Sequence, residues 1–422
     1  MLYNQNMDML FGILIGLLVL MTLVTLHELG HFIAARRNGV RVLEFGIGFP
    51  PRGLAWVQNP HSKKWRRLKK AEWDKPQEGL VFSLNLLPIG GFCQMDGETA
   101  NDKRKGTFGN ASFWSKTKIL FAGVAMNWLT AFVIFTVLAW TGMPQVISGQ
   151  FTVKNDETIV GQKHVVVLEV MEDSPAATAG IEKDDRIIAI NGEEIYSAES
   201  VSAINNQHAG ETVTYTIRRK EQISQEACSE TPCEEYYDVD KILDVTLNSS
   251  DAEYLLGISM SMPQALRRYT WSAPIVGASL TAQLTGETLK SVGDMIGNLV
   301  TGAIKQFNPD EAIRTEGQSD LETVADSVSG PVGIVGILFP AFTAAGPTNV
   351  AFLAALISVS LACMNVLPIP ALDGGRWLLI AIYKLRKKEL TKEIEEKIVS
   401  RAFVVLLAIA FLVTILDVTR FF

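Results

Sequence analysis

Residues 9 to 31 read MLFGILIGLLVLMTLVTLHELGH, an apolar run that ends in two histidines and a glutamate. Residues four apart share a face of a helix, so His27 and His31 can reach one tetrahedral Zn²⁺. Glu28 lies beside them and can take a proton from the metal-bound water. The alternative is that these are polar side chains at a helix end that faces water. Ionisable groups in an apolar span are costly and usually functional, which favours the metal site.

This apolar run is one of four in a hydrophobic chain. The 422 residues are 48% hydrophobic, which is too apolar for an ordinary soluble protein. A membrane span needs about 20 apolar residues, and four runs approach that length: Met9 to Leu26, Ile119 to Gly142, Val350 to Val366 and Ala402 to Val418. No Lys or Arg precedes the first run, whereas Arg36 and Arg37 follow it. It is therefore predicted to be a retained span with the N-terminus outside, not a signal peptide.

Charge differs sharply between the segments that join these runs, although the net charge is only −7. Residues 32 to 118 hold 16 basic and 7 acidic side chains, and residues 374 to 401 hold 8 and 4. Both segments are predicted to be cytoplasmic, because Lys and Arg near span ends stay inside. Residues 143 to 349 hold 13 basic and 30 acidic side chains, which predicts an external segment and argues against nucleic acid as a partner.

A catalytic zinc normally has three protein ligands, and the first motif supplies two. The best candidate for the third is Asp373, in the stretch NVLPIPALDGG at residues 365 to 375. Two prolines end the helix there, and the charge rule places this end of the span inside, level with His27 and His31. Asp-Gly-Gly is also an ordinary turn sequence. Because Asp373 is expected at the same membrane depth as His27 and His31, we favour its role as a metal ligand.

Two stretches of the basic loop, VLEFGIGFPP at 42 to 51 and GLVFSLNLLPIGGFCQM at 79 to 95, are rich in β-formers with Gly and Pro punctuation. They predict β-hairpins or loops that dip into the membrane face, packed on protein or lining a water-filled cavity. An edge strand near Leu87 to Phe92, which includes Gly90 and Gly91, could hold an extended peptide by strand addition. The alternative is a purely structural hairpin.

The external segment alternates strand-like runs with short helical signals, which predicts a small α+β domain. Cys228 and Cys233 could form a short disulfide there, or stay reduced. Residues 271 to 304 have the apolar spacing of an amphipathic helix lying on the outer membrane surface. Gly330 to Phe342 is expected to associate with the membrane without crossing it, and a version with two crossings in this region stays open.

Taken together, these motifs resemble the site-2 protease family of intramembrane zinc metalloproteases, peptidase M50, in its bacterial regulator-of-sigma-E form with one PDZ-like domain. The resemblance covers nearly the whole chain, including HELGH, FGIGF, LPIGGF, Asn127 in AGVAMN, SGPVGI at 329 to 334 and NVLPIPALDGG. It implies one Zn²⁺ held by His27, His31 and Asp373, with Glu28 as general base. It also implies substrate-positioning roles for Asn365, Pro368 and Pro370, to which the edge-strand hypothesis adds Gly90 and Gly91.

The predicted fold is an α-helical polytopic membrane protein with about four transmembrane helices, membrane-associated β-hairpins or loops, and an inserted extracytoplasmic PDZ-like α+β domain. Its expected parts are residues 1–142 and 349–422 as the membrane core, 143–264 as the PDZ-like domain, and 265–348 as a membrane-associated linker. The expected location is the bacterial inner membrane. Both termini and the PDZ-like domain would lie outside, and the active site would lie near the cytoplasmic side.

The resemblance implies regulated intramembrane proteolysis of single-pass proteins in the lipid bilayer, such as anti-sigma factors or remnant signal peptides. The PDZ-like domain would bind peptide termini or limit access by bulky external domains. One alternative is a catalytically silent scaffold, against which the intact HExxH motif, Asp373 and Asn365 argue. The other is a metal transporter, which would need polar groups at midplane on several spans, whereas here they cluster at one depth.

Overall fold

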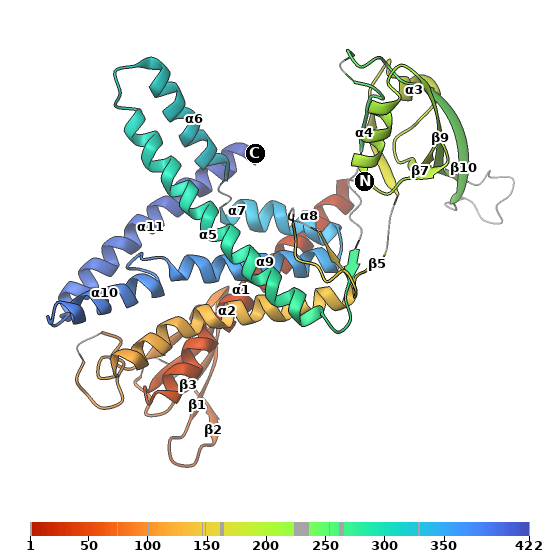
Figure 1. The fold of residues 1–422 in the computed structure, drawn as a ribbon. Helices are drawn as coiled ribbons and strands as arrows, with labels where there is room; N and C mark the ends of the chain where they lie inside the picture. The colour runs from red at the N-terminus through yellow and green to blue at the C-terminus, as the bar shows by residue number, and fades with distance from the viewer. Residues whose placement is uncertain are drawn as a thin grey trace. The chain divides into compact units, whose positions relative to one another are not determined.

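The computed structural model describes residues 2–73, 75–99, 102–145, 147, 149–160, 164–222, 236–252, 254–260, 266–327 and 330–421. The chain divides into two compact units, which are described separately (Figure 1). Unit 1 comprises Met1–Ala139 and Trp271–Phe422, and unit 2 comprises Trp140–Thr270.

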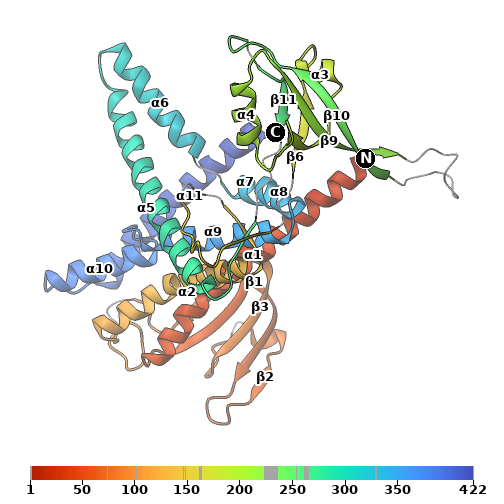
Figure 2. The same cartoon turned by 45° about the vertical axis from the view of Figure 1, so that its right-hand side comes forward.

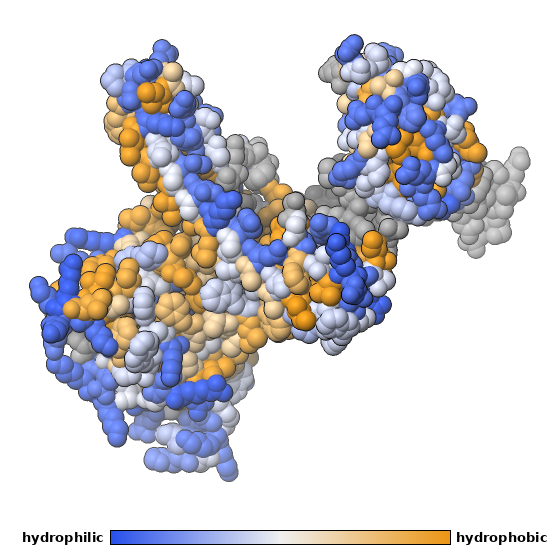
Figure 3. All heavy atoms as spheres, in the orientation of Figure 1, coloured by the Kyte–Doolittle hydropathy of each residue, from blue (hydrophilic) through white to orange (hydrophobic). Residues whose placement is uncertain are grey.

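Unit 1 is built on long apolar helices. Four of them are long and apolar enough to cross a membrane, over Met9–Arg37, Phe113–Thr141, Pro347–Val366 and Lys392–Thr419. They belong to α1 (Leu2–Arg37), α2 (Phe113–Thr141), α9 (Pro347–Val366) and α11 (Lys392–Phe421). The four predicted spans are thus confirmed as helices. Figure 3 shows broad hydrophobic areas on this bundle, with hydrophilic residues along the margin where α10 (Asp373–Leu385) ends.

A curved antiparallel sheet packs beside the C-terminal half of α1 (Figures 1 and 2). It contains β1 (Val42–Gln58), β2 (Trp65–Arg67) and β3 (Val81–Met95), in the order β2-β1-β3, with a short 3₁₀ turn η1 (Lys70–Glu72) between β2 and β3. Phe45 of β1 pairs with both Phe82 and Cys93, so the first half of β1 lies between the two halves of β3. The predicted β-hairpins are confirmed. Over its second half, β3 pairs within the described residues with β1 alone, which leaves one strand edge free.

The helix expected over 271 to 304 is present as α5 (Ala273–Lys305), but its two halves have different surroundings. In the first half, Leu280 and Leu284 are buried in the bundle, and Gly277 lies against Thr136 of α2. In the second half, Ile296 and Leu299 of the same apolar series are exposed, and the helix pairs with α6 (Glu311–Ser327). The first turns of α5 therefore pack on protein while its second half does not, and the position of this helix at the membrane surface stays a prediction.

The segment after residue 330 is helical and packs against the N-terminal half of α1. It consists of α7 (Pro331–Gly333), the π-helical η3 (Ile334–Leu338) and α8 (Phe339–Ala344). Phe339 is fully buried against Gly16 of α1. The backbone N–H groups of Gly330 and Gly333 donate to the buried carboxylate of Asp417 on α11, at 3.1 and 2.8 Å. Asp417 thus satisfies N–H groups that a helix start leaves without partners.

Unit 2 is an α+β domain, as predicted. Its main sheet has the order β10-β9-β7-β6-β11, with β8 pairing β7, and a small sheet has the order β4-β12-β5. The core buries Val165, Ile187 and Tyr215, and the buried Asp185 pairs with Arg219 at 2.7 Å. The predicted Cys228–Cys233 bridge lies outside the described residues. The elements are β4 (Met143–Pro144), β5 (Thr158–Val160), β6 (Val165–Val170), α3 (Pro175–Ala179), β7 (Arg186–Ile190), β8 (Glu193–Glu194), α4 (Ala198–Gln207), β9 (Thr212–Gln222), β10 (Tyr236–Thr246), β11 (Ile258–Met260) and β12 (Leu266–Arg268).

Candidate metal centre

Three side-chain donors from the two ends of the chain meet inside unit 1. His27 and His31 lie on successive turns of α1, both buried, and their Nε2 atoms are 3.1 Å apart. Asp373 begins α10, and its Oδ2 lies 3.2 Å from His27 Nε2 and 3.3 Å from His31 Nε2. Within the described part of the chain, this is the group of His, Cys, Asp and Glu side chains whose ligand atoms come close enough to hold one ion.

This triangle has the size of one face of a tetrahedral zinc site. Zinc bonds to His nitrogen and carboxylate oxygen are about 2.0–2.1 Å long, so ligand atoms at the corners of a tetrahedron are about 3.3 Å apart. Asp373 Oδ2 is buried and has no hydrogen-bond partner among the described residues. Buried acceptors normally have one, and a cation inside the triangle would supply it. The residues present therefore fit a zinc ion.

Hydrogen bonds from α2 orient both imidazole rings. His31 Nδ1 lies 2.8 Å from the carbonyl oxygen of Ile119, so Nδ1 carries the proton and Nε2 is left as the ligand atom. His27 Nδ1 lies 3.2 Å from the amide nitrogen of Asn127, whose own Oδ1 is buried without a partner. A half-turn of this amide lets Oδ1 accept the Nδ1 proton, which satisfies both groups and leaves Nε2 of His27 as a ligand atom. The backbone at Asn127 is held in turn by Ser358 of α9, whose hydroxyl donates to the backbone carbonyl oxygen of Asn127 at 2.8 Å.

Two glycines allow α1 and α2 to approach at the site. A Cβ atom on Gly123 of α2 would lie 2.6 Å from His31 Nε2 and 2.7 Å from His27 Nε2. A Cβ atom on Gly30 of α1 would overlap the carbonyl group of Ala122. Real Cβ atoms essentially never come so close to other atoms, so only glycine fits at both positions. The backbone of α2 therefore forms the wall against which the imidazoles rest.

The turn between α9 and α10 is equally tight and places the carboxylate. Helix α9 ends at Val366, and the two prolines that follow, Pro368 and Pro370, cannot continue it. A Cβ on Gly374 would overlap the carbonyl of Val366, and one on Gly375 would overlap the carbonyl of Ile369. The two glycines thus let α10 start directly against the turn. Asp373 sits at the first position of this helix, where the dipole also favours a carboxylate.

A cavity of about 260 Å³ surrounds the three donors. Glu28 and Asn365 line it, so the structure brings these predicted residues to the same place as His27, His31 and Asp373. Cys93 of β3 also lines it, and its backbone N–H donates to the Glu28 carboxylate. Burial, helped by the nearby Glu28, raises the pKa of the Cys93 thiol to about 12, which argues against a thiolate at neutral pH.

Gly90 and Gly91 do not line this cavity; they lie where β3 packs on α1, against Val24 and Thr25. A Cβ on Gly91 would lie 2.9 Å from the carbonyl oxygen of Gly46 and 3.2 Å from Thr25 Oγ1. Gly90 has a φ of +79°, a conformation that favours glycine. The two glycines thus bring the free edge of β3 close to the helix that carries the histidines.

Comparison with known proteins gives the family. Residues 15 to 410 match the model described as "Peptidase family M50". The chain belongs to peptidase family M50. Its relatives match over nearly their whole length. A protein of Clostridium acetobutylicum whose name proposes a zinc metalloprotease is 28% identical over 408 residues, which cover 97% of each chain.

Two Bacillus proteins named RasP are similar to this M50 chain at lower identity. The "Zinc metalloprotease RasP" of Bacillus licheniformis is 24% identical over 499 residues, covering 96% of this chain and 98% of the relative. The "Regulator of sigma-W protease RasP" of Bacillus subtilis is 24% identical over 493 residues, covering 95% of this chain and 96% of the relative.

Sequence reasoning about this M50 chain missed several groups around the donors. Gly123 and the carbonyl of Ile119 carry no sequence signal of their own, because their contacts arise only when α2 packs on α1. Arg376 follows Asp373 by one helical turn and pairs with the buried Glu395 of α11 at 3.2 Å. It also donates to the carbonyl of Glu98. Arg376 is a charged residue directly after an apolar span, and this position was the sequence signal that could have identified it as part of the site.

Proposed function

We propose that this chain is an intramembrane zinc metalloprotease that hydrolyses peptide bonds in or near the transmembrane segments of single-pass proteins. The observation that carries the proposal is the triangle of His27, His31 and Asp373, with Glu28 in the same cavity. The family and the relatives named as zinc metalloproteases support the same assignment.

A zinc ion held by His27, His31 and Asp373 would lower the pKa of a bound water toward about 7 and polarise the scissile carbonyl. Glu28 accepts the proton of the attacking water and later passes it to the leaving amine. The N–H of Cys93 donates to the Glu28 carboxylate and so fixes its orientation, while leaving lone pairs for the transferred proton. Ile119 and Asn127 hold the rings of the two histidines with their Nε2 atoms toward the ion.

The substrate has to be extended before it can be cut, because a transmembrane helix hides its carbonyls in its own hydrogen bonds. The free edge of β3 supplies a template for an added strand. Cys93 belongs to this edge strand and also contacts Glu28, so a peptide paired there passes close to the general base. In this proposal Gly90 and Gly91 set the position of the edge strand, and Asn365, Pro368 and Pro370 hold the unwound peptide near the metal.

The proposed location and the proposed role of unit 2 follow from the charge pattern of the sequence and from the family resemblance. The protein is proposed to lie in a bacterial inner membrane with residues 143–264 as an extracytoplasmic PDZ-like domain that limits access or binds peptide termini. Residues 1–142 and 349–422 would form the membrane core, and residues 265–348 a membrane-associated linker. The relative named as a regulator of sigma-W protease supports anti-sigma factors as the substrate class.

Replacement of Glu28 by Gln tests the assignment, because it removes the general base and leaves the three ligands. We expect zinc content and thermal stability to match those of the wild type, while cleavage of a single-span model substrate falls by at least about 100-fold. Cleavage at the wild-type rate would contradict the protease assignment. A change in zinc flux into vesicles, with no change in cleavage, would point to a transporter.

A further inference from the structure

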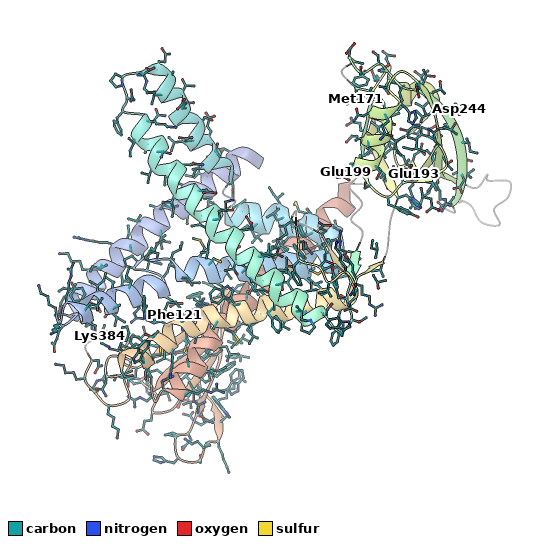
Figure 4. The ribbon with its side chains drawn as sticks, viewed as in Figure 1. Phe121, Met171, Glu193, Glu199, Asp244 and Lys384 are labelled. Atoms are coloured by element: carbon teal, nitrogen blue, oxygen red, sulfur yellow. The ribbon has the colours of Figure 1, made fainter. Side chains whose placement is uncertain are left out.

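A second cavity, of about 400 Å³, lies in unit 1 where α10 ends beside the start of α2. Its volume is within the range of small-molecule sites, about 300–1,000 Å³. Four lysines line it: Lys103 from the loop before α2, Lys116 from α2, Lys384 from the last turn of α10, and Lys388 from the turn that follows α10. Figure 4 labels Lys384 at this place. The metal centre and this cavity share no lining residue.

Carboxylates balance only part of the positive charge in this lysine pocket. Glu389 is the acidic residue in its lining, and it pairs with Lys103 at 3.0 Å. Lys384 and Lys388 make no ion pair with any residue that the structure describes. Lys384 and Lys388 repel each other in the absence of a carboxylate partner, so an anion that binds beside them is attracted by both.

Contacts hold the side chains of two of these lysines, Lys116 and Lys384, and the backbone of Lys388. Lys116 is buried, and its Nζ donates to the carbonyl of Gly109 at 2.8 Å. Lys384 Nζ lies 4.0 Å from the centroid of the Phe113 ring, a cation–π contact. Lys387, two residues after the end of α10, has a left-handed conformation with φ of 53°, and the N–H of Lys388 then donates to the carbonyl of Tyr383 at 3.0 Å. This turn folds the backbone of Lys388 back toward the helix end. The positive end of the α2 dipole adds to the attraction for an anion.

The neighbours of the pocket indicate an anion that belongs to a membrane. The candidate span of α2 begins at Phe113, which lines the pocket. Trp114 is 70% exposed and Leu385 is 83% exposed, one on each helix that forms the cavity. Tryptophan is enriched at the depth of lipid headgroups, and basic pockets between helices on the cytoplasmic side suit anionic headgroups. A soluble phosphate would gain nothing from either exposed apolar side chain.

We propose that the lysine pocket binds the phosphate group of an anionic phospholipid, with the acyl chains along the exposed Trp114 and Leu385. Bound there, the lipid bridges α2 and α10. These are the helix that orients the two imidazoles and the helix that begins with Asp373.

Binding of short-chain lipids to the full-length, zinc-loaded protein in neutral detergent tests the site. The probes are dihexanoyl phosphatidylglycerol, dihexanoyl phosphatidylcholine, glycerol 3-phosphate and inorganic phosphate, titrated by calorimetry. We expect phosphatidylglycerol to bind at least about 10-fold more tightly than each of the others. Similar binding of the two lipids would overturn the proposal. Equal binding of inorganic phosphate and phosphatidylglycerol would show a site for soluble anions and would also overturn it.

The variant for this experiment carries both Lys384→Gln and Lys388→Gln. Each lysine near an anionic membrane surface contributes about a fivefold factor in affinity, so the double variant should bind phosphatidylglycerol about 30-fold more weakly. The matched control, Lys63→Gln with Lys64→Gln, removes two exposed lysines from the turn between β1 and β2 and should change affinity less than twofold. Should the double variant lose zinc or unfold, the pair Lys384→Arg and Lys388→Arg keeps the charge and must retain binding. Equal loss in the control pair would refute a specific pocket.

Discussion

Replacement of Gly123 by alanine should disrupt the metal centre although it removes no ligand. The added Cβ would lie 2.6 Å from His31 Nε2 and 2.7 Å from His27 Nε2, whereas ordinary contact begins at 3.4 Å. The ring nitrogens therefore have to move by about 0.8 Å, or α2 has to retreat by as much. Ligand positions in metal sites tolerate only about 0.2 Å. A movement of α2 away from α1 would also disturb the site, because Ile119 and Asn127 on α2 orient the two imidazole rings.

The expected loss of zinc affinity is at least that for removal of a residue that orients a ligand, about 10–100-fold. Zinc bound per chain, measured by mass spectrometry after dialysis against a graded chelator, gives the affinity, and cleavage of a single-span substrate gives the activity. Gly293→Ala on α5 is the matched control, because nothing lies within 4 Å of its Cβ. That control should keep its zinc and gain about 0.5–1 kcal/mol in stability. If Gly123→Ala keeps wild-type zinc affinity and cleavage, the idea that α2 is the wall of the site is wrong.

Other substitutions test the parts that support the site. Asn127→Leu removes the partner of His27 Nδ1 and should weaken zinc binding about 10–100-fold in the same competition assay; unchanged affinity would mean that the amide does not orient the ring. Asp373→Ala should leave a protein that folds but binds little zinc, and stoichiometric zinc in this variant would contradict the ligand set. Asp417→Ala deprives two backbone N–H groups of a buried charged acceptor and should lower the free energy of unfolding by about 3 kcal/mol. Thermal unfolding in detergent measures this effect, and an unchanged melting temperature would show that the helix start finds other partners.

The sequence was sufficient for the parts of the fold that depend on local pattern. Four apolar runs predicted four helices, and alternating strand-like segments predicted the hairpins of unit 1 and the α+β domain of unit 2. His27 and His31 followed from the helical period alone. Asp373 needed a second argument, the sidedness of basic loops, which placed it at the depth of the histidines before any contact was known.

What the sequence could not provide are contacts that arise only from packing between distant segments. Gly123 looks like any small residue in an apolar helix, and only the docking of α2 on α1 shows that it touches both imidazoles. The apolar series of α5 continues unchanged from Leu280 to Leu299, yet its burial stops partway because the bundle ends before the helix does. Periodicity shows which side of a helix is apolar but not how far its partner extends.

The tight turn after Val366 carries the third donor, Asp373, and comes far later in the chain than both imidazoles. A nascent chain that has been synthesised as far as the end of unit 2 thus carries two of the three donors. Such a nascent chain cannot hold an ion in the same way. Metal binding at this centre therefore has to wait until the segment with Asp373 has been synthesised and has packed beside α1.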